Sequence, residues 1–238
     1  MDDLADAIQN YPHDRVIEKY QKKLYKHEQE LARIERMRIA EKTIGLDGFQ
    51  TIAGVDEVGR GPLAGRVYAA AVILPHDVVF LGINDSKKLS EKKREALFIQ
   101  ITSQAISYAI GYATEQEIDT MNIRNATHLA MQRAVEGLKI KPDYLLIDGN
   151  ECVKSIDIPQ TALIKGDSLS ISIAAASIIA KVTRDRLMQA LHDTYPQYDF
   201  MQNKGYGTAT HMQAILTHGL CPIHRRSFTG NFVGNEHG

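Results

Sequence analysis

The segment GVDEVGRGPLAG, at residues 54–65, constrains the fold of this chain more than any other part of its sequence. β-Forming residues dominate the positions just before its two adjacent carboxylates, Asp56 and Glu57, and they predict a strand over 51–56. A proline follows at position 62, and proline is excluded from central strands. The segment therefore indicates a strand that ends in two acids and gives way to a glycine-rich loop.

The loop after the carboxylates contains Arg60 between two glycines, Gly59 and Gly61. Carboxylates at a strand end can hold a hard divalent cation. Glycine lets a backbone approach a ligand closely, and arginine is suited to bind phosphate. Together these residues predict a metal-dependent enzyme that acts on phosphodiesters. An acidic turn in an ordinary α/β domain is the alternative on these residues alone.

The composition is that of an ordinary globular protein: of 238 residues, 44% are hydrophobic and 24% are charged. The longest apolar runs are far shorter than the ~18 residues that cross a membrane, and the acidic N-terminus has no apolar signal-peptide core. The two cysteines, Cys152 and Cys221, form no metal-binding array and are expected in the core. We therefore expect no membrane association and a location in the reducing cytoplasm.

The net charge of −1 argues weakly against a nucleic-acid binder, because such proteins are usually basic overall. Cations are grouped locally, however, in residues 87–94 and at Arg225-Arg226. A solvated helix face explains the lysine-rich group about as well as a phosphate-facing surface does. Charge alone leaves both interpretations open.

The N-terminal 45 residues differ from the rest, with many Lys, Arg, Glu and Gln and little Gly. The apolar positions that recur there at helical spacing are Ile17, Tyr20, Leu24, Leu31 and Ile34. They predict an amphipathic helix from Arg15 to about Thr43, with a shorter helix before Tyr11-Pro12. A hinge at 45–48 separates a helical N-terminal extension, 1–48, from the catalytic domain, 49–238. Packing on the domain or pairing with a partner is favoured over substrate contact for this extension.

The remainder alternates strand and helix patterns and predicts one α/β domain with a mixed sheet. The predicted strands are 66–74, 107–113 and 144–147. The predicted helices cover 90–105, a stretch that opens at Asn122, 168–193, and 208 to about 219.

Two further acids follow the same logic as the first pair. Asp148 ends an apolar strand, and Asp167 immediately precedes a long helix. In open α/β sheets ligand sites gather beyond strand ends, so these acids can converge with Asp56 and Glu57. Four carboxylates would repel one another unless divalent cations neutralise them, and two such ions suit in-line phosphoryl displacement. Because adjacent strand residues point to opposite faces, we expect the backbone to turn at Asp56-Glu57.

Six blocks of the sequence, in order, resemble those of the bacterial type 2 ribonuclease H (ribonuclease HII) family. The blocks are DEVGRGPLAG at 56–65, NDSKKLS at 84–90, LLIDGN at 145–150, KGDSLSISIAAASIIAKVTRDR at 165–186, NKGYGT at 203–208 and PIHRRSF at 222–228. The resemblance covers about residues 50–230. It implies a ribonuclease H-like mixed β-sheet flanked by helices, and it says little about the N-terminal extension.

The resemblance also implies an activity and a site. The activity is endonucleolytic hydrolysis of the RNA strand of RNA–DNA hybrids, and cutting 5′ to single ribonucleotides in duplex DNA. The acids implied to bind two Mg²⁺ or Mn²⁺ ions and to be catalytic are Asp56, Glu57, Asp148 and Asp167. The residues implied to grip the ribonucleotide are Gly59, Arg60 and Gly61, with Tyr206 packing on the following deoxyribose.

Three cations are candidate phosphate contacts, namely Lys87, Lys181 and Arg184. The histidines, among them His211 and His224, are expected to be structural, because no pair has metal-ligand spacing. We expect a monomer. Two alternatives stand beside the type 2 enzyme: a type 3 ribonuclease H that cleaves hybrids only, and a non-catalytic nucleic-acid-binding module.

Overall fold

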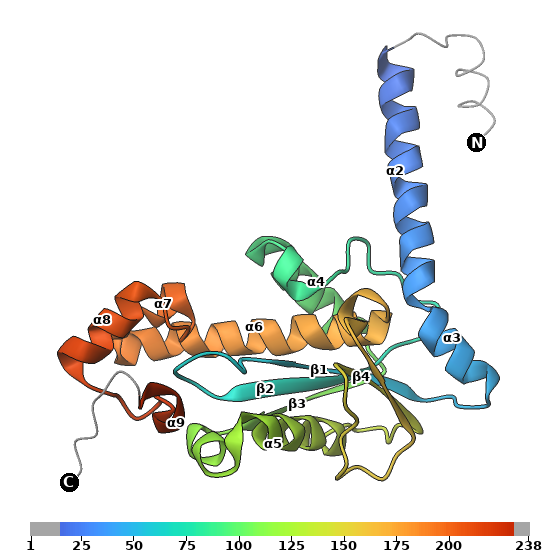
Figure 1. Cartoon of the computed structure of the whole chain (residues 1–238). Coiled ribbons are helices and arrows are strands. Elements are labelled where there is room, and N and C mark those ends of the chain that lie inside the picture. Colours follow the sequence, from blue (N-terminus) through green and yellow to red (C-terminus); the bar gives the residue numbers. More distant parts are fainter. Residues whose placement is uncertain (1–14, 231–238) are drawn as a thin grey trace.

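The structure is a computed structural model that describes residues 15–230. The short helix predicted before Tyr11-Pro12 lies outside this range. A five-stranded sheet in the order β3-β2-β1-β4-β5 forms the centre of the molecule, with helices above and below it (Figure 1). The strands are β1 Ile52–Val58, β2 Val67–Ile73, β3 Ser107–Ala113, β4 Tyr144–Asp148 and β5 Gln160–Leu163.

The sheet is mixed, as predicted. β1, β2 and β3 form an antiparallel meander, whereas β4 runs parallel to both β1 and β5. β5 was not predicted, because its sequence QTAL is short, partly polar and only half buried at the sheet edge. The other strands match their predicted positions to within two residues.

The helices form two layers. α6 (Ile171–Thr194) and α4 (Glu91–Gln104) cover one face of the sheet, and α5 (Glu115–Glu136) covers the other (Figure 1). β2 is fully buried between the layers: Ala70 and Val72 belong to the core beside α6, and Ala69 and Ala71 belong to the core beside α5. α6 also lies directly on β1, because a Cβ added at Gly54 would lie only 2.2 Å from the Ser172 carbonyl carbon.

Several helix boundaries follow local caps. α6 begins later than predicted because the short 3₁₀ turn Gly166–Ser168 precedes it and Ser170 accepts a hydrogen bond from the Ile173 amide. α5 begins earlier than Asn122, at a capping box formed by Thr114 and Glu117. Asn122 has a positive φ of 70° and marks a kink inside α5. The position predicted as the start of a helix is therefore a break within a longer one.

The predicted N-terminal helix is two helices, α2 (Arg15–Met37) and α3 (Ile39–Leu46). The break lies at Arg38, whose guanidinium donates a hydrogen bond to the His76 carbonyl, 2.7 Å away. α3 can then turn so that Ile44 packs against Ile52, Leu146 and Ile173, while α2 projects from the body (Figure 1).

The apolar positions predicted for the packing face of α2 do not all pack. Tyr20, Leu24 and Leu31 are 53%, 43% and 36% exposed, and only Ile34 and Met37 of this helix are buried. Helix α2 therefore docks through its C-terminal end alone.

The C-terminal segment forms a third small core at one end of the molecule. Its elements are the 3₁₀ turn Pro196–Tyr198, α7 (Phe200–Asn203), α8 (Ala209–His218) and α9 (Arg226–Thr229). α8 ends at Gly219, as predicted, and Thr208 caps its start. Among the helices of residues 15–230, none has the length and apolar character needed to span a membrane.

Candidate active site

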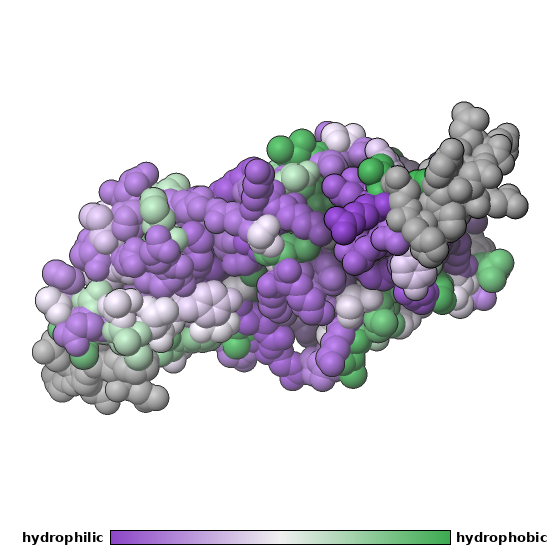
Figure 2. Space-filling view, turned by 90° about the horizontal axis from the view of Figure 1, so that it is seen from above, coloured by the Kyte–Doolittle hydropathy of each residue, from purple (hydrophilic) through white to green (hydrophobic). Residues whose placement is uncertain are grey.

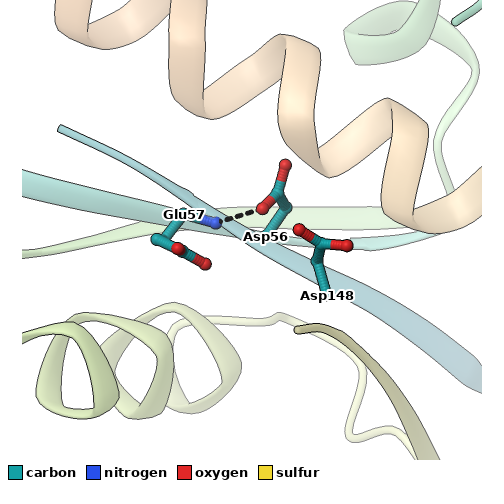
Figure 3. Close-up of side chains that lie close together, drawn as sticks. All are labelled: Asp56, Glu57 and Asp148. Atoms are coloured by element: carbon teal, nitrogen blue, oxygen red, sulfur yellow. Dashed lines mark hydrogen bonds between the residues drawn. The ribbon is translucent and has the colours of Figure 1, made fainter. Parts of the chain in front are cut away.

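Three carboxylates meet at the C-terminal ends of two neighbouring parallel strands. β1 supplies Asp56 and Glu57, and β4 ends at Asp148. Val55 pairs with Ile147, so the next residues, Asp56 and Asp148, lie side by side. One carboxylate oxygen from each acid lies within 4.8 Å of the others (Figure 3).

The expected backbone turn at Asp56-Glu57 is wrong, because β1 continues in regular pairing through Val58. Figure 3 shows Asp56 directed toward α6 and Glu57 toward α5, with Asp148 beside them. The two adjacent side chains leave opposite faces of the strand, as strand geometry requires. They still share a site because it lies at the strand ends, where the acid of the neighbouring strand comes close to both.

The electrostatics of this cluster favour a bound cation. Burial, followed by the carboxylates of Glu57 and Asp148, raises the pKa of Asp56 well above its ordinary value. Burial also raises the pKa of Glu57, and Arg60, whose Nη1 lies 3.4 Å from Glu57 Oε1, opposes that shift. Carboxylate oxygens are the ligands that Mg²⁺ and Mn²⁺ prefer, so the donor set fits such ions.

Asp167 lies next to this group but outside it. Its carboxylate does not come within 4.8 Å of all three other acids. Burial, then Asp85 and Asp148, raises the pKa of Asp167, whereas Lys87 lowers it. The turn that carries Asp167 also holds Asp148, because the Gly166 amide donates a 2.7 Å hydrogen bond to Asp148 Oδ1.

Asp85 is a neighbour that the sequence analysis did not single out, although it belongs to the block at 84–90. It caps the 3₁₀ turn Ser86–Lys88 by accepting a hydrogen bond from the Lys87 amide. Burial lowers the pKa of Lys87, but the carboxylates of Asp56, Asp85 and other acids raise it by more, so the net shift of its pKa is upward. Lys87 thus interacts electrostatically with the acids from the side of Asp85, whereas Arg60 forms the ion pair with Glu57.

The other two candidate phosphate contacts are engaged inside the protein. Lys181 Nζ lies 2.6 Å from Asp185 Oδ1, and Arg94 lies 3.5 Å from the same carboxylate. Burial lowers the pKa of Lys181. This lysine therefore belongs to a partly buried ion-pair network and is not a free surface cation.

Arg184 is fully buried, so the prediction of a direct phosphate contact has to be corrected. Its guanidinium donates to three backbone carbonyls, those of Ala64 (3.1 Å), Arg66 (3.3 Å) and Lys204 (2.9 Å). A buried arginine whose donors are all directed at the backbone holds loops in place. We therefore assign Arg184 a positioning role.

Arg225, which the sequence analysis noted only as part of a basic pair, does the same for the glycine-rich loop. It donates to the carbonyls of Gly59 (2.6 Å), Arg60 (2.9 Å) and Gly65 (2.8 Å). Gly59 has a φ of +90°, and a Cβ there would lie 2.3 Å from Arg184 Nε. Two buried arginines, Arg184 and Arg225, thus hold the glycine-rich loop in place. Only glycine is tolerated at position 59, because of its positive φ and the close approach of Arg184.

Tyr206 lies beside this loop and is 42% exposed. A Cβ added at Gly61 would lie 3.8 Å from its ring. Its carbonyl accepts a hydrogen bond from Nδ1 of the buried His211, and Nε2 of His211 lies 3.0 Å from Nε2 of His224. The Cys221 amide donates to His224 Nδ1, which makes both imidazoles neutral links in one chain of hydrogen bonds. These histidines support the tyrosine loop.

The strand order, the mixed sheet covered by helices and the acids at the ends of β1 and β4 define a nuclease of the ribonuclease H-like class. Residues 53–231 match the family model described as ribonuclease HII. The chain belongs to the ribonuclease HII family.

Curated relatives cover most of the chain. It is 54% identical over 220 residues to ribonuclease HII of Acetivibrio thermocellus, an alignment that spans 92% of this chain and 86% of the relative. It is 58% identical over 199 residues to ribonuclease HII of Desulfitobacterium hafniense, spanning 84% and 76% of the two chains. The solved structure of ribonuclease H2 from Pyrococcus horikoshii OT3 is similar with a TM-score of 0.66 and 26% identity, over 78% of this chain and 100% of that one.

Proposed function

We propose that this protein is a metal-dependent endonuclease that hydrolyses the RNA strand of RNA–DNA hybrids and cuts 5′ to single ribonucleotides in duplex DNA. The observation that carries the proposal is the convergence of Asp56, Glu57 and Asp148 at two strand ends, next to a glycine loop held by buried arginines. The family to which the chain belongs supports the same activity.

The metal site is formed by the three clustered acids together with Asp167. Two Mg²⁺ or Mn²⁺ ions at this site would supply an activated water and stabilise the leaving oxygen. Without cations the acids would repel a phosphate backbone, so substrate and metal binding are coupled. Lys87 offsets part of the remaining negative charge from the side of Asp85 and Asp167.

The substrate is recognised by the clamped loop and by Tyr206. RNA differs from DNA by its 2′-hydroxyl, which both donates and accepts hydrogen bonds. Since Arg225 occupies the carbonyls of Gly59 and Arg60, the loop reads the ribonucleotide mainly through its amides and the carbonyl of Gly61. Tyr206 packs on the next sugar and favours one that lacks the hydroxyl.

The wider setting completes the proposal. Residues 49–238 form the catalytic domain and residues 1–48 a helical extension of it. The protein acts as a monomer in the cytoplasm, on RNA–DNA hybrids and on DNA that contains ribonucleotides.

A cleavage assay on three duplexes tests the proposal: DNA with one embedded ribonucleotide, an RNA–DNA hybrid, and DNA alone, each with Mg²⁺ and with a chelator. We expect metal-dependent cutting of the first two and none of the third. Cutting of the hybrid alone would indicate the type 3 activity. Binding without any cutting would indicate a non-catalytic module.

A further inference from the structure

The N-terminal half of helix α2 is a strongly basic segment in a chain whose net charge is −1. Residues 15–26 contain five cations and one acid, which gives this segment a net charge of +4. The acids of α2 gather instead near its docked end, where Glu30 pairs with Arg33 at 2.7 Å and Glu35 pairs with Lys42 at 2.5 Å. Helix α2 is thus divided into a C-terminal part whose charges form ion pairs and an N-terminal, projecting half that is basic.

The cations of the projecting half form one row. The row, at steps of three or four residues, is Arg15, Lys19, Lys22 and Lys26, and it continues through Glu30, Arg33 and Met37. Residues at these steps share one face of a helix. All four cations of the row are exposed, and no ion pair within residues 15–230 involves them. We name these four residues the basic ladder.

The lower part of the same row fixes the direction in which the ladder points. Glu30 Oε1 accepts a 2.7 Å hydrogen bond from the Gly82 amide, and Arg33 Nη2 donates to the Ile83 carbonyl. The face of α2 that carries the ladder is therefore the face turned toward the loop at residues 81–83. The exposed apolar positions, Tyr20 and Leu24, lie on a different face of the helix.

That loop leads directly to the acids of the active site. Lys87 follows Gly82 by five residues, which span at most ~17 Å, and its ammonium group is under the influence of Asp56 and Asp167. Helix α2, which carries the ladder, projects away from the body on the same side of the sheet as α4 and α6 (Figure 1). The face of the molecule seen from the side on which α2 projects is mainly hydrophilic, with hydrophobic residues only in scattered patches (Figure 2).

We propose that the basic ladder of α2 binds the phosphate backbone of the substrate duplex outside the cleavage site. The row from Arg15 to Lys26 is ~16 Å long, and phosphates recur every ~3.4 Å along each strand of a duplex. The ladder therefore matches the phosphates of about five base pairs. The proposal rests on the substrate being a nucleic-acid duplex, and it adds an arm that grips the duplex independently of its sequence.

The test measures binding in a cleavage-deficient Asp148→Asn background, so that its result does not depend on turnover. The ladder variants are Lys22→Gln/Lys26→Gln and the same pair with Arg15→Gln/Lys19→Gln. Gln keeps helix propensity and removes the charge. The matched control is Lys139→Gln/Lys141→Gln, which removes two exposed charges elsewhere. A further variant, Tyr20→Gln/Leu24→Gln, changes the exposed apolar residues on another face of α2.

The readout is the dissociation constant at several salt concentrations for a duplex of about 30 base pairs with the ribonucleotide near one end or the other. Each lost phosphate contact should lower the slope of log K against log salt by about 0.9. We expect slopes about 2 and 4 units smaller for the double and quadruple ladder variants, and at least tenfold weaker binding for the latter. The effect should appear for only one placement of the ribonucleotide, because the arm extends to one side.

Equal slopes for the parent and the quadruple variant would overturn the proposal. The proposal would also be overturned if sedimentation detected a dimer, and if Tyr20→Gln/Leu24→Gln both dissociated that dimer and weakened duplex binding as much as the ladder variants do. In that case the projecting helix would be a protein–protein interface. Circular dichroism of each variant confirms that the helix persists.

Discussion

At the scale of single residues, Tyr206 offers a direct test of how the junction is recognised. Its ring is exposed beside the glycine loop, while its backbone is fixed by His211. We expect Tyr206→Ala to cost roughly 1–3 kcal/mol on a single embedded ribonucleotide, by analogy with base–aromatic stacking, or one to two decades in kcat/KM. The loss should be smaller on a long hybrid, whose next sugar already carries a 2′-hydroxyl.

The measurement is the ratio of kcat/KM on the two substrates. Tyr206→Phe keeps the ring and should keep the ratio. If Tyr206→Ala lowers both rates equally, the ring supports the fold or the metal site and does not discriminate between the sugars.

Asp56 gives a second test at this scale, through the pH dependence of stability. Its pKa in the folded protein is raised well above 3.8, so the folded state binds more protons than the unfolded state between these two values. The metal-free protein should therefore lose stability as the pH rises from about 4 through the raised pKa. Asp56→Asn should reduce this loss and leave the smaller part that Glu57 and Asp167 contribute, and Mg²⁺ should offset the loss in the wild type.

Chemical denaturation in the presence of a chelator, over this pH range, measures the effect. The prediction would be contradicted if the metal-free wild type gained stability with rising pH in this window and Asp56→Asn abolished the gain. Such a result would mean that the carboxylate of Asp56 is not buried in a cluster of acids.

At the scale of elements, the clamp beneath the glycine loop explains why the loop needs buried arginines. Arg225→Lys would leave carbonyls of Gly59, Arg60 and Gly65 without donors, and each buried unsatisfied group costs about 1–3 kcal/mol. We expect a lower melting temperature and a loss of at least about tenfold in kcat/KM on the single-ribonucleotide substrate. The neighbouring exposed residue supplies the control, because Arg226→Lys should change neither quantity. Equal behaviour of the two variants would show that the clamp is dispensable.

The N-terminal helices make a second element-scale prediction, which separates their docked and projecting parts. Deleting residues 1–28 leaves Ile34, Met37 and the contacts of Arg33 in place, so the melting temperature should stay close to that of the full chain. Deleting residues 1–45 removes the buried Ile34, Met37 and Ile44, each worth about 1.5–3 kcal/mol.

The longer deletion also removes Glu41, which accepts hydrogen bonds from Ser170 and Ser172 at the start of α6. We expect this variant to melt at least several degrees lower and to cut substrate only below that temperature. Thermal melting followed by circular dichroism, together with cleavage assays, measures both. Equal melting of the two deletions would show that α3 and the docked end of α2 contribute nothing to the stability of the fold.

At the scale of the whole molecule, the sequence predicted the mixed sheet, its main strands and the approach of Asp56, Glu57 and Asp148 to one another, whereas Asp167 lies outside that cluster. Those features are local: apolar strand patterns, caps such as Ser90 and Thr208, and the glycine at 219 are visible in short windows. The position of β5 was not visible, because an edge strand of four half-buried residues has no distinct pattern.

Long-range contacts account for the remaining differences. The sequence suggested phosphate-binding or surface cations at Arg184 and Arg225, and only the folded chain shows that they donate to backbone carbonyls, most of them more than 100 residues away. The break at Arg38 depends on a carbonyl of the loop after β2. The apolar residues Tyr20, Leu24 and Leu31 of α2 are exposed, which shows that an amphipathic pattern predicts a helix without specifying which of its faces packs against the rest of the protein.

We expect the acids at the ends of β1 and β4 to bind the divalent cations with which the enzyme cuts the strand at a ribonucleotide. The most direct measurement is Mg²⁺-dependent cleavage of a duplex with one ribonucleotide by Asp148→Asn, compared with Asp157→Asn, an exposed acid outside the cluster. Even residues behind metal ligands cost about 10–100-fold when changed, so we expect Asp148→Asn to lose more than about 100-fold. Its melting temperature should be equal or higher, because fewer like charges then crowd the site. Cleavage by Asp148→Asn at a rate close to that of Asp157→Asn would contradict the assignment.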